Sequence, residues 1–305
     1  MSMSTEYAAR GAGPGRSASE VRVPGRWATV LRRMLRTRQV VIGLCCIALL
    51  VAMAWIGPLL SPWELGERDN SAFLRPPSPE HWWGTDEVGG DIFVNTMVGL
   101  RKSLVIGLLV AVLSTFIAAV VGAFAGYFLG ATDRILMWIT DLALVLPSFL
   151  ILAILSPALR DRGWLVFVLL LAAFMWMVTS KMVRGMTMSL KEREYVLAAH
   201  YMGAPAWRII FGHIIPNMSS LLVVDATVNV SAAIITETSL SYFGFGVQSP
   251  DVSLGSLIAD GSGAATTHPW LFAFCTGSLV VLVLAVNLIG DGLRDALDPQ
   301  SRHRF

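Results

Sequence analysis

Long apolar runs separated by short polar stretches dominate the pattern of this chain. A run of about 20 largely apolar residues is long enough to cross a bilayer as a helix. The segments that meet or approach that length are residues 40–60, 104–128, 135–155, 164–183, 221 to about 242, and 270–289. The pattern therefore predicts an all-α fold, a polytopic membrane protein with six transmembrane helices.

The first apolar run could be mistaken for a secretory signal. It is preceded by 39 residues, and no small-x-small cleavage site follows it. A signal peptide has a short basic leader and such a site. We expect the run to be an uncleaved membrane anchor.

Composition indicates that lipid is part of the solvent of this chain. Of its 305 residues, 55% are hydrophobic and 14% are charged, which is more apolar surface than one water-soluble domain can bury. The net charge of +2 argues against a nucleic-acid-binding protein, which would carry a strongly basic face. The three cysteines lie in apolar runs and lack metal-ligand spacing, so we interpret them as packing residues.

Basic residues predict the orientation of the spans, because cytoplasmic loops carry an excess of Lys and Arg. With a cytoplasmic N terminus, 17 of the 23 Lys and Arg residues lie on the inner side. The first outer segment instead carries seven acidic residues. Both termini are therefore predicted to be cytoplasmic.

The spans and loops predict the organisation of the chain. A cytoplasmic tail at 1–39 and the first spanning helix at 40–60 precede an extracytoplasmic segment at 61–103. The core at 104–290 contains the largest internal cytoplasmic loop, residues 189–217, and a cytoplasmic tail at 291–305 follows.

The second span contains GAFAGYFLG, which places Gly122, Gly126 and Gly130 four residues apart. This spacing puts glycines on one helix face, where a neighbouring backbone can approach closely in lipid. We interpret the three as helix-packing residues, and nothing in the pattern requires a ligand.

The cytoplasmic loop contains EYVLAAHYMGAPAWRIIFGHIIPN, residues 194–217, which predicts two short helices that meet at a glycine. Ser189 and Glu192 have the spacing of a capping box, so a helix is predicted to begin near residue 190. Gly203 would end it in the left-handed conformation after about three and a half turns. A second helix is predicted to begin at Pro205 and to break at Pro216.

One face of the first helix is predicted to combine Tyr195, Ala198, Ala199 and Met202, with small side chains at its centre. Such a face on a cytoplasmic helix indicates docking into a groove of another protein. The alternative is an interfacial helix that lies on lipid.

The same loop resembles the coupling segment of the permease subunits of binding-protein-dependent ABC importers. That segment has alanines, a glycine four residues later and a proline near its end. The matching residues here are Glu194, Tyr195, Ala198, Ala199, Gly203 and Pro216. The family usually carries an acidic residue where this chain has Leu197, so a salt bridge from that position is not expected.

Three more motifs resemble the dipeptide/oligopeptide permeases of that family. Residues 78–93 read SPEHWWGTDEVGGDIF, residues 236–250 read TETSLSYFGFGVQSP, and residues 287–299 read NLIGDGLRDALDP. They occur in the family's order, and the resemblance covers nearly the whole chain after the first twenty or so residues. Gly90 departs from the pattern, because family members usually carry arginine there.

The resemblance implies a type I ABC importer permease fold in the inner membrane of a bacterial cell. It also implies a heterodimer with a homologous permease, two cytoplasmic ATPases that receive the coupling helices, and an extracytoplasmic binding protein. The residues expected to couple to an ATPase are Glu194, Tyr195, Leu197, Ala198, Ala199, Gly203, Pro205 and Pro216. Di- or oligopeptides are the expected substrates, although relatives with these motifs import nickel complexes, haem or other small solutes.

The chain itself carries no nucleotide-binding motif. None of its three lysines follows a glycine, so no GxxxxGK[ST] phosphate loop is present. HExxH and GxSxG are also absent, and the five histidines are scattered. We expect no catalytic residue, metal site or cofactor in this chain, with ATP and Mg²⁺ bound by the partner subunits.

Acidic residues inside predicted spans are candidates for function, since charge in a membrane is costly. Asp225 and Asn229 lie one turn apart in the fifth span, and Glu237 lies near its outer end. These residues and Asp141 are candidates for lining the pathway, and pairing between helices explains them about as well. By resemblance, Asp141 supports helix packing or a break at Pro147. The alternative from another class is an ion-coupled secondary transporter, in which Asp141 or Asp225 carries a proton.

Overall fold

The computed structural model describes residues 34–35, 37–158, 163–247 and 250–297. The predicted N-terminal tail up to residue 33 and the predicted C-terminal tail from residue 298 lie outside these ranges. Within them the chain is helical and forms no strand. The helices long and apolar enough to span a membrane alone are α2 (Arg38–Leu60), α3 (Ile92–Phe128), α11 (Ser219–Tyr242) and α13 (Pro269–Leu297).

Two further spans are broken helices. α4 (Gly130–Val145) and α5 (Ser148–Leu155) are bent by 80° relative to each other, and α6 (Trp164–Met175) and α7 (Met177–Leu190) by 50°. With each pair counted as one span, the described chain has the six predicted spans.

The bend between α4 and α5 agrees with the break at Pro147 that the resemblance implies, whereas the prediction of one helix over 164–183 is wrong at the second bend. The first bend follows Pro147, which has no N–H to donate to a continuing helix. No proline or glycine marks the second bend, where Trp176 separates α6 from α7.

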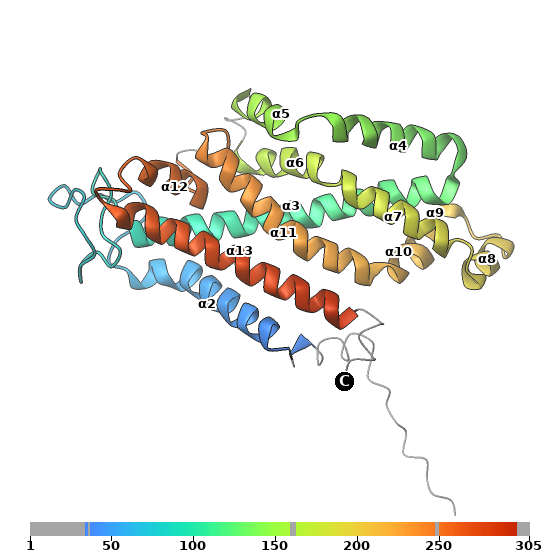
Figure 1. Cartoon of the computed structure of the whole chain (residues 1–305), viewed down its shortest axis with the longest axis horizontal. Helices are drawn as coiled ribbons and strands as arrows, with labels where there is room; N and C mark the ends of the chain where they lie inside the picture. The colour runs from blue at the N-terminus through green and yellow to red at the C-terminus, as the bar shows by residue number, and fades with distance from the viewer. Residues whose placement is uncertain (1–33, 36, 159–162, 248–249, 298–305) are drawn as a thin grey trace, which may run out of the picture.

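The central helix of the bundle is α3, which packs against α2, α6, α7 and α11 (Figure 1). Its 37 residues correspond to about 55 Å, which exceeds a bilayer core of about 30 Å. The prediction that this helix begins at residue 104 is wrong. It begins at Ile92 because the Asp91 carboxyl caps it, accepting a hydrogen bond from the Val94 N–H at 2.9 Å.

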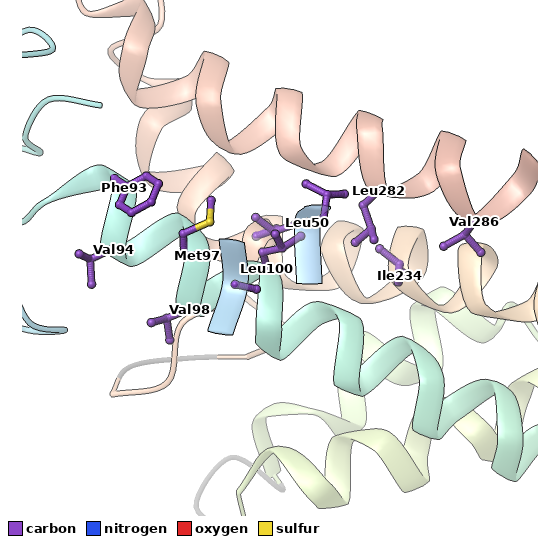
Figure 2. Packing of buried hydrophobic residues seen from close by; sticks show 11 residues of the cluster. Leu50, Phe93, Val94, Met97, Val98, Leu100, Ile234, Leu282 and Val286 are labelled. Atoms are coloured by element: carbon purple, nitrogen blue, oxygen red, sulfur yellow. The ribbon is translucent and has the colours of Figure 1, made fainter. Parts of the chain in front are cut away.

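A hydrophobic core near the beginning of α3 joins α2, α3, α11 and α13, and the first residue of α12 (Leu254–Ser262) also belongs to it. Figure 2 shows side chains of α2, α3, α11 and α13 gathered in it. Met97 and Leu100 of α3, Ile234 of α11 and Leu282 of α13 have no exposed surface. Because lipid tails are as apolar as these side chains, close packing holds such helices together within a membrane.

Glycines allow α7 to approach α3 closely. A Cβ on Gly122 would lie 2.3 Å from the Ser180 carbonyl oxygen, and one on Gly126 would lie 2.6 Å from the Arg184 carbonyl oxygen. Gly130 takes no part in this contact, contrary to the prediction that groups it with the other two. It lies at the turn into α4 with φ +57°, and nothing is within 4 Å of its Cβ position.

The two ends of the bundle contain different elements (Figure 1). One end, which we call the α8 end, holds α8 (Glu194–Tyr201), α9 (Ala206–Ile209), the π-helical turn η2 (Ile210–Ile214) and α10 (Ile215–Asn217). The start of α2 and the last turn of α13 point toward this end. The opposite, α12 end holds α12 (Leu254–Ser262) and the segment between α2 and α3.

Candidate functional site

The exposed helix α8 is shorter than the sequence predicts. α7 continues to Leu190, so Ser189 lies inside α7 and forms no capping box with Glu192. α8 begins at Glu194, after Arg193, whose side chain makes no cap hydrogen bond. The predicted start near residue 190 is wrong because α7 remains packed on α3 as far as Thr187, which contacts the Cβ position of Gly126.

Gly203 ends α8 in the left-handed conformation that the sequence predicts, with φ +79°. The Gly203 N–H donates to the His200 carbonyl at 3.0 Å, and the Ala204 N–H donates to the Ala199 carbonyl at 3.1 Å. These bonds form a Schellman motif, which satisfies carbonyls that a helix end leaves unpaired. Nothing lies within 4 Å of the Gly203 Cβ position, so the backbone angle alone favours glycine.

The helical stretch after Gly203 is irregular. Pro205 is the N-cap of α9. Pro216 does not break the helix as predicted, because the backbone passes through the π turn η2 and continues to Asn217. A wider π turn reduces the clash between a proline ring and the carbonyl four residues earlier. The Asn217 side-chain amide donates to the His213 carbonyl at 2.6 Å.

A small hydrophobic core fastens α8 to the bundle. Val196 and Ala199 are 2% and 4% exposed and face this core. Its other buried members are Ala123 of α3, Val183 of α7, and Ile209, Ile210, Ile214 and Met218. The prediction that Ala199 lies on the exposed face is wrong, because it follows Val196 by three residues and shares its inward direction.

The opposite side of α8 is apolar and exposed. Tyr201 and Met202 are 84% and 80% exposed, and Tyr195 and Leu197 are 41% and 40% exposed. Contiguous apolar surface of this kind marks interaction sites. Figure 1 shows α8 at the extremity of the bundle. We call this surface the docking face, and its members are Tyr195, Leu197, Ala198, Tyr201 and Met202.

Asp225 of α11 is held by two neutral donors. The Thr179 hydroxyl of α7 and the Asn229 side-chain amide each lie 2.9 Å from its Oδ2 atom. Within the described residues no basic side chain pairs with it. Because an acid in a span faces protein or a water-filled cavity rather than lipid, the partly exposed side of this cluster is expected to be covered by one of these.

Asp141 of α4 forms an ion pair with Lys181 of α7, and both side chains are about half exposed. A second pair links the same helices, since Arg184 donates to both Asp133 carboxyl oxygens at 2.5 and 2.6 Å. Lys181 and Arg184 are not among the functional candidates predicted from the sequence. Lys181 lies inside the predicted span 164–183, and the rule that singles out acids in spans applies equally to basic residues. Arg184 lies one residue beyond that span and would not have been found in this way.

Glu237 of α11 is fully buried, unlike the other acids predicted to line a pathway. Its carboxyl oxygens accept hydrogen bonds from the hydroxyls of Ser103 in α3 and Ser241 in α11. In this conformation the side chain therefore lies between helices of the same chain.

The α12 end contains a buried histidine that the sequence analysis did not single out. His81 is 2% exposed, with Nδ1 2.9 Å from Asp91 Oδ2, Nε2 3.5 Å from Asp69 Oδ2, and Trp63 stacked on its ring. Hydrogen bonds from Ser71, together with the contact to His81, hold the pKa of Asp69 below its ordinary value. Since Asp91 also caps α3, this cluster fixes the segment before α3 to the start of that helix.

Within the described residues, no group of three or more His, Cys, Asp or Glu side chains is placed to hold a metal ion. The structure assembles an exposed apolar face at the α8 end and a hydrogen-bonded polar interior at the α12 end.

Comparison with known proteins shows two family matches. Residues 118–303 match the family described as binding-protein-dependent transport system inner membrane component. Residues 25–77 match the N-terminal TM domain of oligopeptide transport permease C. Together they include α2, the part of α3 from residue 118 onward, and all the described helices after α3, among them the α8–α10 segment.

Similar proteins align over nearly their full length. The oligopeptide transport system permease protein OppC of Mycobacterium tuberculosis is 52% identical over 274 residues, 90% of this chain and 94% of the relative. The protein of the same name from Mycobacterium bovis has the same values. The OppC protein of Bacillus subtilis is 37% identical over 276 residues, 90% of each chain.

These matches agree with a bundle of apolar helices long enough to span a membrane. They also place the chain in the inner membrane as a multi-pass protein. The chain belongs to the family of inner membrane components of binding-protein-dependent transport systems, as an ABC permease of the dipeptide/oligopeptide type.

Proposed function

We propose that this chain is the transmembrane permease subunit of an ATP-driven importer of di- and oligopeptides. A homologous permease completes the translocation pathway as its heterodimer partner, and an extracytoplasmic binding protein delivers the substrate. Two cytoplasmic ATPases bind ATP and Mg²⁺. The observation that carries the proposal is the exposed apolar docking face of α8 in a chain of this permease family.

The way α8 is attached supports coupling to the ATPases. The docking face contacts the ATPase, while Val196 and Ala199 on the other side pack into a core shared with α3 and α7. Gly203 fixes the angle between α8 and α9. A displacement of α8 therefore moves two spans directly and reaches α11 through α10. In this scheme Glu194 begins the helix, and Pro205 and Pro216 shape the segment that follows it.

Pathway lining is assigned to Asp225, Asn229 and Asp141. Each lies in a span and is only partly buried, which favours a water-filled or protein-covered surface over lipid. The Asp141–Lys181 pair presents both charges to that surface. A zwitterionic peptide, with one ammonium and one carboxylate, has matching charges for both.

Charge and the fold support one orientation in the membrane. The α8 end is proposed to be cytoplasmic, because the excess of Lys and Arg is on that side. The start of α2 and the last turn of α13 lie toward the same end, so both termini are proposed to be cytoplasmic.

The proposal is tested by co-expressing the chain with its permease, ATPase and binding-protein partners and reconstituting the complex in proteoliposomes. Uptake of a labelled peptide that requires ATP and the binding protein supports it. Proton-driven uptake by the purified chain alone would establish the ion-coupled secondary transporter instead. Nickel, haem or another solute found in the purified binding protein would keep the importer and change its substrate.

A further inference from the structure

A buried carboxyl group near the α12 end is used by none of the steps above. Glu237 has no exposed surface. Its Oε2 accepts a hydrogen bond from the Ser103 hydroxyl at 2.9 Å, and its Oε1 accepts one from the Ser241 hydroxyl at 2.7 Å. Both carboxyl oxygens are thus occupied, one by α3 and the other by α11.

Each of these hydroxyls also accepts a hydrogen bond from a backbone N–H. Ser241 Oγ accepts from the Val247 N–H at 3.1 Å, and Ser103 Oγ accepts from the Leu254 N–H at 3.2 Å. A hydroxyl has one proton to donate and lone pairs to accept with. By accepting a hydrogen bond from each hydroxyl, Glu237 turns the lone pairs of each serine oxygen toward the backbone N–H. The carboxyl group thus begins two relays, each of which runs through one serine hydroxyl to one backbone amide.

One relay ends at Val247 and the other at Leu254. These residues belong to two neighbouring pieces of chain, residues 244–247 and 250–256, which we call the outer wall. The wall approaches α11 closely at glycines. A Cβ on Gly246 would lie 2.0 Å from Ser241 Oγ, and a Cβ on Gly255 would lie 2.5 Å from the Thr238 carbonyl oxygen. An ion pair between Asp251 and Lys102 of α3, at 2.7 Å, is a third attachment.

The outer wall forms one side of a cavity of about 490 Å³ at the α12 end. Val247, Asp251 and Ser256 line it from the wall, and Arg68 and Asp86 line it from the segment between α2 and α3. This cavity lies at the end of the bundle opposite α8, which in the proposed function faces the extracytoplasmic binding protein.

We infer that Glu237 is a positioning residue that holds the outer wall in the shape that the binding protein meets. The inference rests on the proposed function for its partner, but the positioning itself is a property of this chain alone. Without Glu237, both serine hydroxyls lose their common acceptor and rotate, so each piece of the wall loses the hydrogen bond that Glu237 orients. The ion pair between Lys102 and Asp251 and the hydrogen bond from the Phe245 N–H to the Leu240 carbonyl remain.

Backbone hydrogen exchange in the complete complex tests the positioning directly. Ser241→Ala should raise exchange about tenfold in the peptide containing Val247 only, and Ser103→Ala should do so in the peptide containing Leu254 only. Glu237→Ala should raise both. Ser231→Ala, which removes a buried hydroxyl of α11 that has no hydrogen-bond partner, should change neither. Unchanged exchange at both peptides in Glu237→Ala would overturn the inference.

The functional consequence is tested by adding increasing concentrations of ligand-loaded binding protein to the complex and measuring its ATPase activity. For Glu237→Ala we expect the half-saturating concentration of binding protein to rise about tenfold while the maximal rate stays within about twofold. If Glu237 only stabilised the fold, its substitution would instead reduce the amount of assembled transporter, and the maximal rate would fall in proportion. If the binding protein stimulates the wild-type complex and the half-saturating concentration of Glu237→Ala is unchanged, the role of the outer wall in meeting the binding protein is overturned.

Two features keep the result interpretable. If Glu237→Ala does not assemble, Ser103→Ala and Ser241→Ala each leave the carboxyl group with one donor and test one relay at a time. If the wild-type complex shows no stimulation by any binding protein, the proposed importer function fails, while the exchange pattern still confirms or overturns the positioning.

Discussion

The two ends of this bundle are built in opposite ways. At the α8 end, large apolar side chains face outward, and α8 begins without a side-chain cap. At the α12 end, Glu237, His81 and Asp91 are 0%, 2% and 5% exposed and are hydrogen-bonded to other parts of the chain. The α8 end therefore has a surface that another protein can cover, whereas the α12 end holds its own shape.

The comparison predicts different failures at the two ends. Changes at the α8 end should impair communication with a partner while leaving the bundle folded. Changes at the α12 end should loosen the structure of that end.

The largest expected effect is that of Gly203→Leu on transport. A side chain at φ +79° costs about 1–2 kcal/mol, and relief of that strain changes the angle between α8 and α9. We expect ATP-dependent uptake and stimulated ATPase activity to fall to background, while the separate binding protein still binds its ligand. Proteoliposome uptake and ATPase assays measure both.

Gly185→Ala is the matched control for Gly203. It lies within α7, and nothing is within 4 Å of its Cβ position, so uptake should remain close to wild type. Normal uptake by Gly203→Leu would show that the glycine between α8 and α9 is not needed for coupling, and would favour a scaffold without a transport role.

The next largest effect is expected from Asp91→Ala at the α12 end. This change removes the cap of α3 and a partner of buried His81, which together contribute about 2–3 kcal/mol. The thermal unfolding midpoint of the purified chain should fall by several degrees. Glu194→Ala, an exposed first-turn position of α8, should change stability by less than about 0.5 kcal/mol. Equal shifts for the two variants would contradict the contrast between the ends.

Leu197→Glu should have an intermediate effect that is confined to coupling. The side chain is 40% exposed on the docking face, and a new charge in an apolar contact must lose water. We expect ATPase stimulation to fall about tenfold, with the unfolding midpoint unchanged. Leu197→Met, which keeps the apolar character, should retain stimulation. No effect of the glutamate would mean that position 197 is outside the contact.

The fold was largely predictable from sequence because span length and loop charge act locally. The six spans and the conformation of Gly203 each depend on a short stretch of residues. The start of α3 was missed because residues 92–103 include polar side chains, such as Thr96 and Ser103, that are buried against other helices. A hydropathy pattern treats such residues as a loop.

The candidate site was predictable only in part, for a similar reason. The sequence identifies the α8 segment, but not that Ala199 faces inward, because the packing of Ile209 and Ile214 under α8 decides it. It also identifies Glu237 without its partners. Ser103 is more than a hundred residues away in the chain, and a local pattern cannot pair the two.

The smallest expected effect is a change of the unfolding midpoint on replacing either of two acids of the α12 end, with opposite signs for the two. Burial, and repulsion from Asp86 and Glu87, raise the pKa of Asp260 in α12, so its charged form destabilises the folded state. Stability should fall as pH rises through that pKa. Asp260→Asn should therefore raise the unfolding midpoint at pH 7, by about 1 °C, and the gain should disappear below about pH 4.

Asp69→Asn is the counterpart, because hydrogen bonds from Ser71 and the contact with His81 lower the pKa of Asp69. The ionised carboxylate then stabilises the folded state above its ordinary pKa, and this contribution is lost as pH falls through the lowered value. The Asp69 variant should thus be slightly less stable than wild type at pH 7. Midpoints measured at pH 7 that shift in the same direction for both variants would show that the charges at the α12 end are not balanced as the structure indicates.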